Sequence, residues 1–330
     1  MISQPSMAAL QGVLLLAHGG PDSLDDVAPF LANIRGGRPT PPQLVEEVRE
    51  RYRLIGGRSP LLEISRRQAA ALQRELNAAG ERYRVYLGMR NWRPFIRETM
   101  EQVQRDGVSS LLAFCLAPQN SRKSVGLYFQ HVRDAQQNLG WEIPTAFVES
   151  WHLEPLLIEA FAEKLHDALA SFPEAREIPP AILFTAHSLP ERILEEGDPY
   201  DREVRETAAA VARRCGIADW RFAYQSQGAT GEKWLGPTVE SVLEDFAAAG
   251  VCRVLLAPIG FVADHVEILY DIDILFQQFA AQRGIVLRRS GSLNDNPTFV
   301  RALAALVERH LNTPGAAPMA PRAAQVSRER

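Results

Sequence analysis

Short apolar runs alternate along the chain with longer stretches in which apolar and polar positions repeat at helical spacing. The apolar runs are rich in Val, Ile, Leu and aromatic residues, which favours buried β-strands. Strands are expected at residues 12–17, 83–88, 109–116, 145–148, 181–186, 221–225, 252–258 and 285–289. Amphipathic helices are expected in the gaps, for example at 41–55, 60–77 and 202–215. This alternation predicts an α/β fold with right-handed βαβ units and parallel sheets flanked by helices.

A faint internal repeat divides the pattern into two halves. LLLAHGGP (14–21) and LFTAHSLP (183–190) share Leu-x-x-Ala-His-x-x-Pro at the end of the strand that opens each half. Leu-Ala-Pro recurs in the same order at 116–118 and 256–258. Two matches in one order predict two similar α/β domains. Because ligands of such sheets bind beyond the carboxyl ends of the strands, His18, His187 and the segment after Pro258 are expected to border one interdomain cleft.

The segment GFVADHVEILYDID (260–273) places four acids and one histidine beside this expected cleft. On a helix, Asp264, Glu267 and Asp271 would share one stripe, whereas Asp273 would lie on the opposite side in solvent. Repulsion along the stripe would cost about a few tenths of a kcal/mol per pair, and a bound cation would offset it. For Asp264 alone, the alternative is an acidic helix N-terminus favoured by the helix dipole.

An imidazole facing a carboxylate across the expected cleft suits a divalent transition metal. His187 and Glu267 are the two candidates, and two protein ligands leave coordination positions open for a substrate that is itself a ligand. The alternative for His187 is a strand-end histidine that only hydrogen-bonds the backbone.

Composition narrows the functional classes. A chain of 330 residues that is 46% hydrophobic can build two domains, and a net charge of −4 gives no electrostatic footprint for nucleic acid. No segment approaches the roughly 20 apolar residues of a transmembrane helix, and the N-terminus does not resemble a signal peptide, so a cytoplasmic protein is expected.

The three cysteines are far apart, which argues against disulfides or a thiolate metal site, and Cys115 and Cys252 are expected to be buried. Residues 313–330 are expected to form a disordered tail.

Several long motifs resemble the signature segments of ferrochelatases, the enzymes that insert ferrous iron into a porphyrin. They are TAHSLPER (185–192), GDPY (197–200), YQSQGATGEKWLGPTVE (224–240), GFVADHVEILYDID (260–273), RYRLIGGRSPL (51–61), GMRNWRPFI (88–96) and LAPQNSRKSVGLY (116–128). The resemblance implies the chelatase fold, with two Rossmann-like domains around an active-site cleft. Its domains would comprise residues 10–148 plus 290–312, including a returning C-terminal helix, and residues 149–289.

Within the family, the chain is most similar to bacterial coproporphyrin ferrochelatases, because NIRGGRPTPPQL (33–44) resembles their arginine-bearing loop. Four propionates of coproporphyrin III would suit several Arg and hydroxyl donors. The resemblance aligns five residues with porphyrin contacts: Arg35, Arg51, Tyr52, Ser59 and Tyr128. For Arg51 and its neighbour Arg53, solvated pairing with glutamates of the same helix is the alternative.

Two positions depart from the family pattern. His18 stands where relatives carry tyrosine, phenylalanine or methionine close to the metal, so it either ligates iron or hydrogen-bonds the Gly19–Gly20 turn. Leu275 stands where some relatives continue the acidic row, which puts an outer metal site in doubt.

The resulting hypothesis is a ferrochelatase of haem biosynthesis that converts coproporphyrin III to iron coproporphyrin III. His187 and Glu267 would hold iron and accept the pyrrole protons, with Asp264 and Asp271 as a short relay. Fe²⁺ would be a substrate, with no other cofactor and no iron–sulfur cluster, and the protein would be a monomer with transient contacts to neighbouring haem-pathway enzymes. The alternatives are a protoporphyrin IX ferrochelatase, a chelatase for another tetrapyrrole, and a non-catalytic haem or metal carrier.

Overall fold

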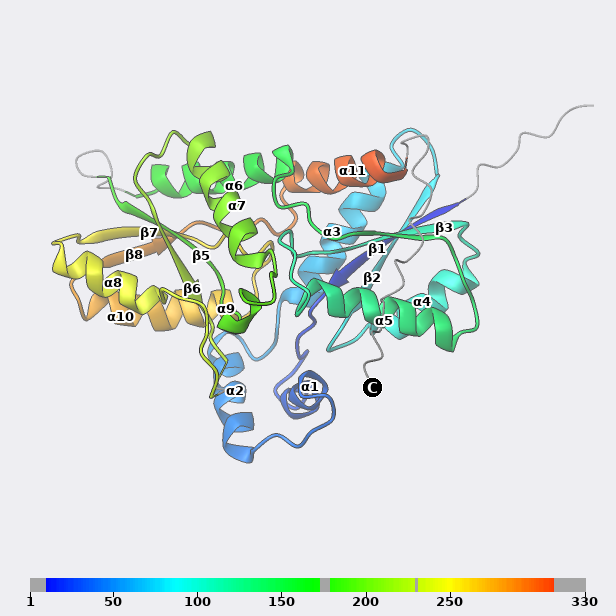
Figure 1. The fold of residues 1–330 in the computed structure, drawn as a ribbon, viewed down its shortest axis with the longest axis horizontal. Helices are drawn as coiled ribbons and strands as arrows, with labels where there is room; N and C mark the ends of the chain where they lie inside the picture. Colours follow the sequence, from blue (N-terminus) through cyan, green and yellow to red (C-terminus); the bar gives the residue numbers. More distant parts are fainter. Residues whose placement is uncertain (1–9, 173–178, 229–230, 312–330) are drawn as a thin grey trace, which may run out of the picture.

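The chain forms two four-stranded parallel sheets with helices packed around them (Figure 1). The computed structural model describes residues 10–172, 179–228 and 231–311. Each of the eight predicted strands is present, with its ends displaced by at most one residue. The predicted α/β fold is therefore confirmed, whereas the expected tail at 313–330 lies outside the described residues.

The first sheet has the strand order β2-β1-β3-β4. Its strands are β1 (Gln11–Ala17), β2 (Tyr83–Met89), β3 (Ser110–Cys115) and β4 (Thr145–Val148). Helices connect or follow them: α1 (Val27–Ile34), α2 (Pro42–Leu54), α3 (Leu61–Leu76), α4 (Ile96–Arg105) and α5 (Val125–Asn138).

The second sheet repeats this topology with the order β6-β5-β7-β8. Its strands are β5 (Ala181–His187), β6 (Arg221–Gln225), β7 (Arg253–Ala257) and β8 (Val286–Arg289). Its helical elements are α6 (Pro155–Ala170), the 3-10 turn η1 (Glu191–Ile193), α7 (Tyr200–Arg214), α8 (Val239–Ala248), α9 (Val266–Leu269), the π-helix η2 (Asp271–Phe276) and α10 (Gln277–Ala281). Because β1 and β5 hold equivalent central places, the repeated Ala-His sequence marks equivalent strand ends.

The core explains why the strands are continuous apolar runs. In β1, Val13 and Leu15 pack into a cluster with residues of α3, α6, α7 and α11, whereas Leu14 and Leu16 pack on the other face against α4 and α5. A strand covered on both faces has no polar side, as is typical of parallel sheets.

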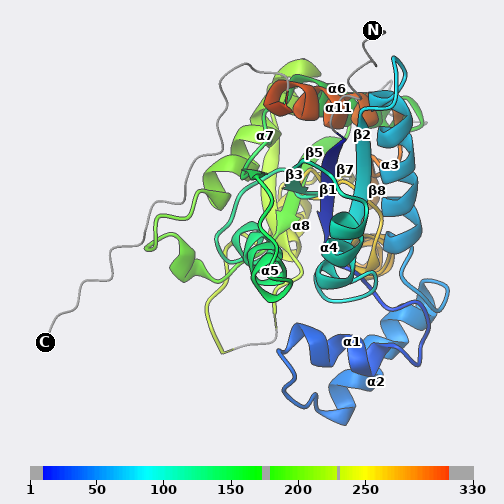
Figure 2. The same cartoon turned by 90° about the vertical axis from the view of Figure 1, so that its right-hand side faces the viewer.

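The last helix, α11 (Pro297–Leu311), joins the two halves. It contacts α3, which flanks the first sheet, and α6, which flanks the second (Figure 2). Phe299 of α11 stacks on Trp151, which follows β4, with their ring centroids 6.1 Å apart. The returning helix therefore buries aromatic surface at the junction.

Helices α1 and α2 project beyond the carboxyl end of β1 (Figures 1 and 2). Val27, Leu31 and Tyr52 form a small apolar cluster there, and Val266 of α9 packs against it. This contact brings α2 next to the acidic segment of the second half.

Two further sequence expectations can be compared with the fold. Across the three described ranges, no helix is both long enough and apolar enough to cross a bilayer. Cys115 is buried as expected, but Cys252 is exposed, because it precedes β7 instead of lying within it.

Candidate active site

The carboxyl ends of β1 and β5 position the two histidines of the repeat. His187 is the last residue of β5 and His18 directly follows β1. Gly260 brings the acidic segment to the end of β5: its amide donates to the Thr185 carbonyl at 3.1 Å, and a Cβ at this position would lie 2.6 Å from the Cβ of Ala186. Only glycine fits this close approach, so Gly260 places Glu267 within reach of His187.

His187 and Glu267 face one another as the sequence predicted. Nε2 of His187 lies 3.5 Å from Oε1 of Glu267, and each side chain is about one-third exposed. The His187 Nδ1 donates to the carbonyl of Ser188, which directs Nε2 toward the carboxylate. Burial opposes the imidazolium form, but Glu267, the Ser188 carbonyl and Asp271 together outweigh it and raise the pKa of His187.

Glu267 also contacts a second imidazole. The His265 Nε2 lies 3.4 Å from Oε2 of Glu267, while its Nδ1 donates to the Ala263 carbonyl at 3.0 Å. Burial disfavours the carboxylate, but His187 and His265 together hold the pKa of Glu267 well below its ordinary value. Glu267 therefore favours the ionised form and lies between two histidines.

The backbone under Glu267 is held by β6. Gln225 at the end of that strand donates from Nε2 to the Glu267 carbonyl at 2.9 Å, and its Oε1 accepts from the Thr185 hydroxyl at 2.8 Å. Thr185 and Gln225 are both buried, so these bonds fix α9 against the sheet.

Asp271 is the first residue of the π-helix, and its pKa is shifted in the opposite direction from that of Glu267. Its Oδ2 accepts a 2.5 Å hydrogen bond from Ser226, a non-glycine residue at φ 61°. Burial raises the pKa of Asp271 to about 6; the Ser226 bond and Arg51 oppose this, and the Glu267 charge adds to it. Asp271 is therefore the acid of this segment that can exchange a proton near neutral pH.

The predicted acidic stripe is wrong for Asp264, and Asp273, which was expected to be solvated, instead pairs with Arg289. Asp264 precedes α9, and its carboxylate accepts hydrogen bonds from Ser292 at 2.7 Å and Asn294 at 2.8 Å. Arg289 lies 3.3 Å from Asp264 and donates twice to Asp273, at 2.6 and 2.9 Å. The predicted stripe requires one continuous helix, whereas the chain is extended at His265, so that Asp264 lies before the helix, and Arg289 pairs with both carboxylates.

Several charged or titratable groups of the site influence the pKa of His18. Its Nδ1 donates to the Gly19 carbonyl at 3.0 Å, and within the described ranges its Nε2 has no hydrogen-bond partner. The surrounding protein lowers the pKa of His18; Arg90 and His265 lower it further, whereas the Gly19 bond and Glu267 raise it. The lowered pKa favours the neutral form of the His18 imidazole, and this exposed residue keeps an Nε2 that no described residue occupies.

Tyr52 and Tyr128, two of the predicted porphyrin contacts, are buried within electrostatic range of Glu267. Burial raises the pKa of both phenols, and the Glu267 charge raises it further. Ser59 packs against the turn after β1: a Cβ on Gly20 would lie 2.5 Å from its hydroxyl oxygen. The Tyr52 hydroxyl lies 3.8 Å from the same Cβ position, so the structure brings Ser59 and Tyr52 together at the end of β1.

The two predicted arginine contacts lie on the projecting helices. Arg35 caps α1, and its buried Nε has no hydrogen-bond partner among the described residues. Arg51 of α2 stacks over the Tyr270 ring at 5.3 Å. Arg53 pairs with Glu46 and Glu50, as the solvated alternative proposed, but no ion pair links Arg51 to a described residue.

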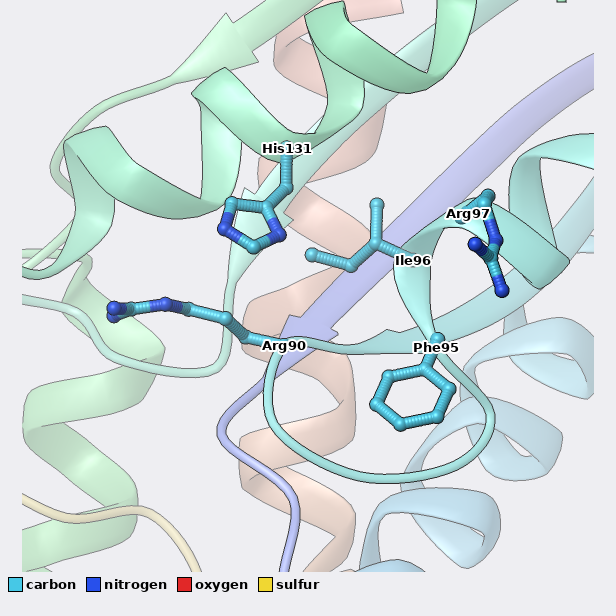
Figure 3. A pocket seen from close by; sticks show the side chains of 5 residues that line it. All are labelled: Arg90, Phe95, Ile96, Arg97 and His131. Carbon is cyan, nitrogen blue, oxygen red and sulfur yellow. The ribbon is translucent and has the colours of Figure 1, made fainter. Parts of the chain in front are cut away.

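The sequence reasoning missed three residues: His265, Ser226 and Arg90. His265 was visible within the acidic segment, two positions before Glu267, but its contact depends on the sharp turn into α9. Arg90 stacks over the Tyr128 ring at 5.6 Å and acts on His18. Figure 3 shows it at one end of a pocket formed with Phe95, Ile96, Arg97 and His131, which holds none of the predicted site residues.

No group of three or more His, Cys, Asp or Glu side chains within the described ranges is arranged to hold a metal ion. The His187–Glu267 pair can therefore supply two ligands, and the remaining positions would belong to the substrate. Such a pair can bind a transition metal and exchange protons in one place.

Comparison with known proteins identifies a family that performs this chemistry. The ferrochelatase family model matches residues 10–311. A protein named ferrochelatase from Deinococcus radiodurans is 40% identical over 300 residues, which cover 90% of this chain and 95% of that protein. A coproporphyrin III ferrochelatase from Geobacillus kaustophilus is 36% identical over 300 residues, covering 90% and 94%.

Solved structures support the fold independently. SirB from Bacillus subtilis with Fe³⁺ superposes with a TM-score of 0.60 at 10% identity, covering 94% of this chain and 100% of that one. With the family match across both halves, the chain belongs to the ferrochelatase family, the enzymes that insert Fe²⁺ into a porphyrin in haem synthesis.

Proposed function

We propose that the enzyme converts coproporphyrin III and Fe²⁺ into iron coproporphyrin III, with His187 and Glu267 as metal ligands. The observation that carries this proposal is the 3.5 Å approach of His187 Nε2 to Glu267 Oε1. Two ligand atoms that are each about 2.1 Å from one metal ion lie about 3.0–3.4 Å apart. The pair thus needs only a small adjustment to share an incoming Fe²⁺.

Insertion releases two pyrrole protons, and the site offers two suitable acceptors. The raised pKa of His187 favours transfer of one proton to Nε2 once that nitrogen releases the metal. Glu267 is a poor acceptor for the second proton because its pKa is held low. Asp271, with a pKa raised to about 6, is better suited.

The relay in this proposal therefore runs through Asp271 and not Asp264. The Asp264 carboxylate is already occupied by Ser292, Asn294 and Arg289. Asp271 instead accepts a hydrogen bond from Ser226 and lies within electrostatic range of Glu267.

The preference for coproporphyrin rests on the two arginines. A porphyrin propionate would give the buried Arg35 Nε the partner that the described residues do not supply. Arg51 would add a second charge-assisted contact, and the Tyr52, Ser59 and Tyr128 hydroxyl groups would complete the porphyrin contacts. Propionate binding would also supply the energy that bends the macrocycle toward the metal. Fe²⁺ enters as a substrate, and the proposal includes no further cofactor.

The test compares two porphyrins in an anaerobic cuvette with ferrous iron. Each charge-assisted contact contributes about 1.5–3 kcal/mol, so kcat/KM for coproporphyrin III should exceed that for protoporphyrin IX at least about tenfold. Arg35→Gln and Arg51→Gln should each reduce this preference. Arg53→Gln is the matched control, because Arg53 lies on the same helix but pairs with Glu46 and Glu50. Equal efficiency with both porphyrins would reject the coproporphyrin assignment in favour of protoporphyrin.

A further inference from the structure

The GDPY segment (197–200) connects the two halves of the chain through hydrogen bonds, one of which reaches the backbone of His187. Asp198 is only 7% exposed, yet it lies at the boundary between the halves and contacts no member of the metal-binding pair. Its carboxylate Oδ2 accepts hydrogen bonds from the Ser121 hydroxyl at 3.1 Å and the Arg122 amide at 2.8 Å. Ser121 and Arg122 follow β3 of the first sheet, so Asp198 of the second half holds a loop of the first.

The same loop is held at a second place. The Arg122 guanidinium donates to the Glu196 and Gly197 carbonyls at 3.2 and 3.4 Å. Gly197 has φ +66°, a conformation that places its carbonyl in this turn without steric cost. All four hydrogen bonds run in one direction: the loop after β3 donates them, and the carboxylate of Asp198 and the carbonyls of Glu196 and Gly197 accept them.

From Asp198 the connection continues to the active site. The other carboxylate oxygen, Oδ1, accepts from the Tyr200 amide at 3.0 Å and so fixes the start of α7. The Tyr200 side chain is buried, and its hydroxyl donates to the His187 carbonyl at 2.9 Å. The carbonyl belongs to the residue whose Nε2 faces Glu267.

We propose that Tyr200 is a positioning residue for His187, and that Asp198 couples this position to the loop after β3. Pairing with β6 fixes His187 from the side of the second sheet, and the Tyr200 bond adds a fixed point at its carbonyl. A displacement of about 1 Å at a reacting group is enough to lower turnover severely. By anchoring His187 to a group fixed by the first half, the chain sets the imidazole relative to both walls of the site. This inference rests on the proposed role of His187.

The test uses Tyr200→Phe, which keeps the buried ring and removes only the hydroxyl. The matched control is Tyr86→Phe, because Tyr86 is also buried but donates to Asp106 away from the site, at 2.8 Å. Tyr200→Phe should lower kcat on the order of tenfold with the KM for coproporphyrin III unchanged within about twofold. Tyr86→Phe should leave both constants unchanged.

A structural readout keeps the test independent of activity. In protein with ¹⁵N-labelled histidine, the His187 imidazole signal can be assigned by its loss in His187→Gln, since the chain has seven histidines. Tyr200→Phe and Asp198→Asn should each move this signal, and the double variant should move it less than the sum of the two. An unmoved signal, or a kcat of Tyr200→Phe within twofold of the parent, would overturn the inference. A parent protein without insertion activity would instead reject the proposed function, and the imidazole signal would still decide the positioning role.

Discussion

Replacing Glu267 by glutamine tests the centre of the proposed mechanism with little change in shape. The substitution removes one negative charge that lies 3.5 Å from His187 Nε2. At that separation, two unit charges interact by about 1 kcal/mol in water and about 5 kcal/mol at an effective dielectric constant of 20. Because both side chains are about one-third exposed, the lower part of this range applies. Removing this charge should therefore lower the pKa of His187.

The substitution should lower kcat by more than the lost charge interaction alone would do. Glutamine offers a weaker oxygen ligand for Fe²⁺ and leaves His187 less able to accept a proton, so kcat should drop about 10²–10⁴-fold. Porphyrin affinity should stay unchanged, since the propionate contacts are intact. Anaerobic turnover followed in the Soret band gives kcat, and quenching of porphyrin fluorescence gives the affinity.

A matched control exists in the same molecule. Glu206 pairs with Nε2 of His152 at 2.8 Å, a histidine–glutamate pair outside the proposed site. Glu206→Gln should insert iron at the parental rate, with a thermal midpoint similar to that of Glu267→Gln. If both variants inserted iron with the parental kcat, the role of Glu267 as a ligand would be refuted.

Further predictions concern the other titratable groups. His187→Ala should abolish insertion while porphyrin still binds, and activity within a few-fold of the parent would contradict its role. Below the raised pKa of His187, Nε2 is protonated and can neither bind iron nor accept a proton; kcat/KM should therefore rise with pH through a transition above about pH 6.5, and a transition below pH 6 would disagree with the pairing. Asp271→Asn should lower kcat about tenfold without changing porphyrin affinity, and an unchanged kcat would remove Asp271 from the proton path. His18→Phe should retain insertion but lose a histidine-type spectrum in bound iron coproporphyrin, and an unchanged spectrum would restrict His18 to its bond with Gly19.

The sequence predicted the strands and their repeat because the responsible interactions are local or periodic. The run from Val13 to Leu16 is apolar at every position since each face of β1 is covered by helices. The repeated Ala-His sequence placed His18 and His187 at equivalent strand ends because the two sheets share one topology. The hydrophobic periodicity and the internal repeat were therefore sufficient to predict the fold.

Side-chain pairing in the acidic segment could not be predicted in this way. Arg289 arrives from β8, 25 residues after Asp264, and its contacts with Asp264 and Asp273 are visible only in three dimensions. The change to a π-helix at Asp271 likewise has no periodic signal in the sequence. Spacing rules apply within one helix, and the four acids of this segment are divided between the chain before α9, α9 itself and the π-helix η2.

The two equivalent histidines show how one repeated strand end acquires two chemistries. Glu267 lies beside His187 and raises its pKa, whereas the surrounding protein, Arg90 and His265 lower the pKa of His18. Because the two pKa values are displaced in opposite directions, His187 is the stronger base of the two imidazoles. In the proposed reaction the unprotonated form of His187 therefore suits proton acceptance, and His18 suits ligation of the finished product through its Nε2, which has no hydrogen-bond partner among the described residues. The difference comes from partners outside the repeat, which is why equal sequence motifs need not have equal roles.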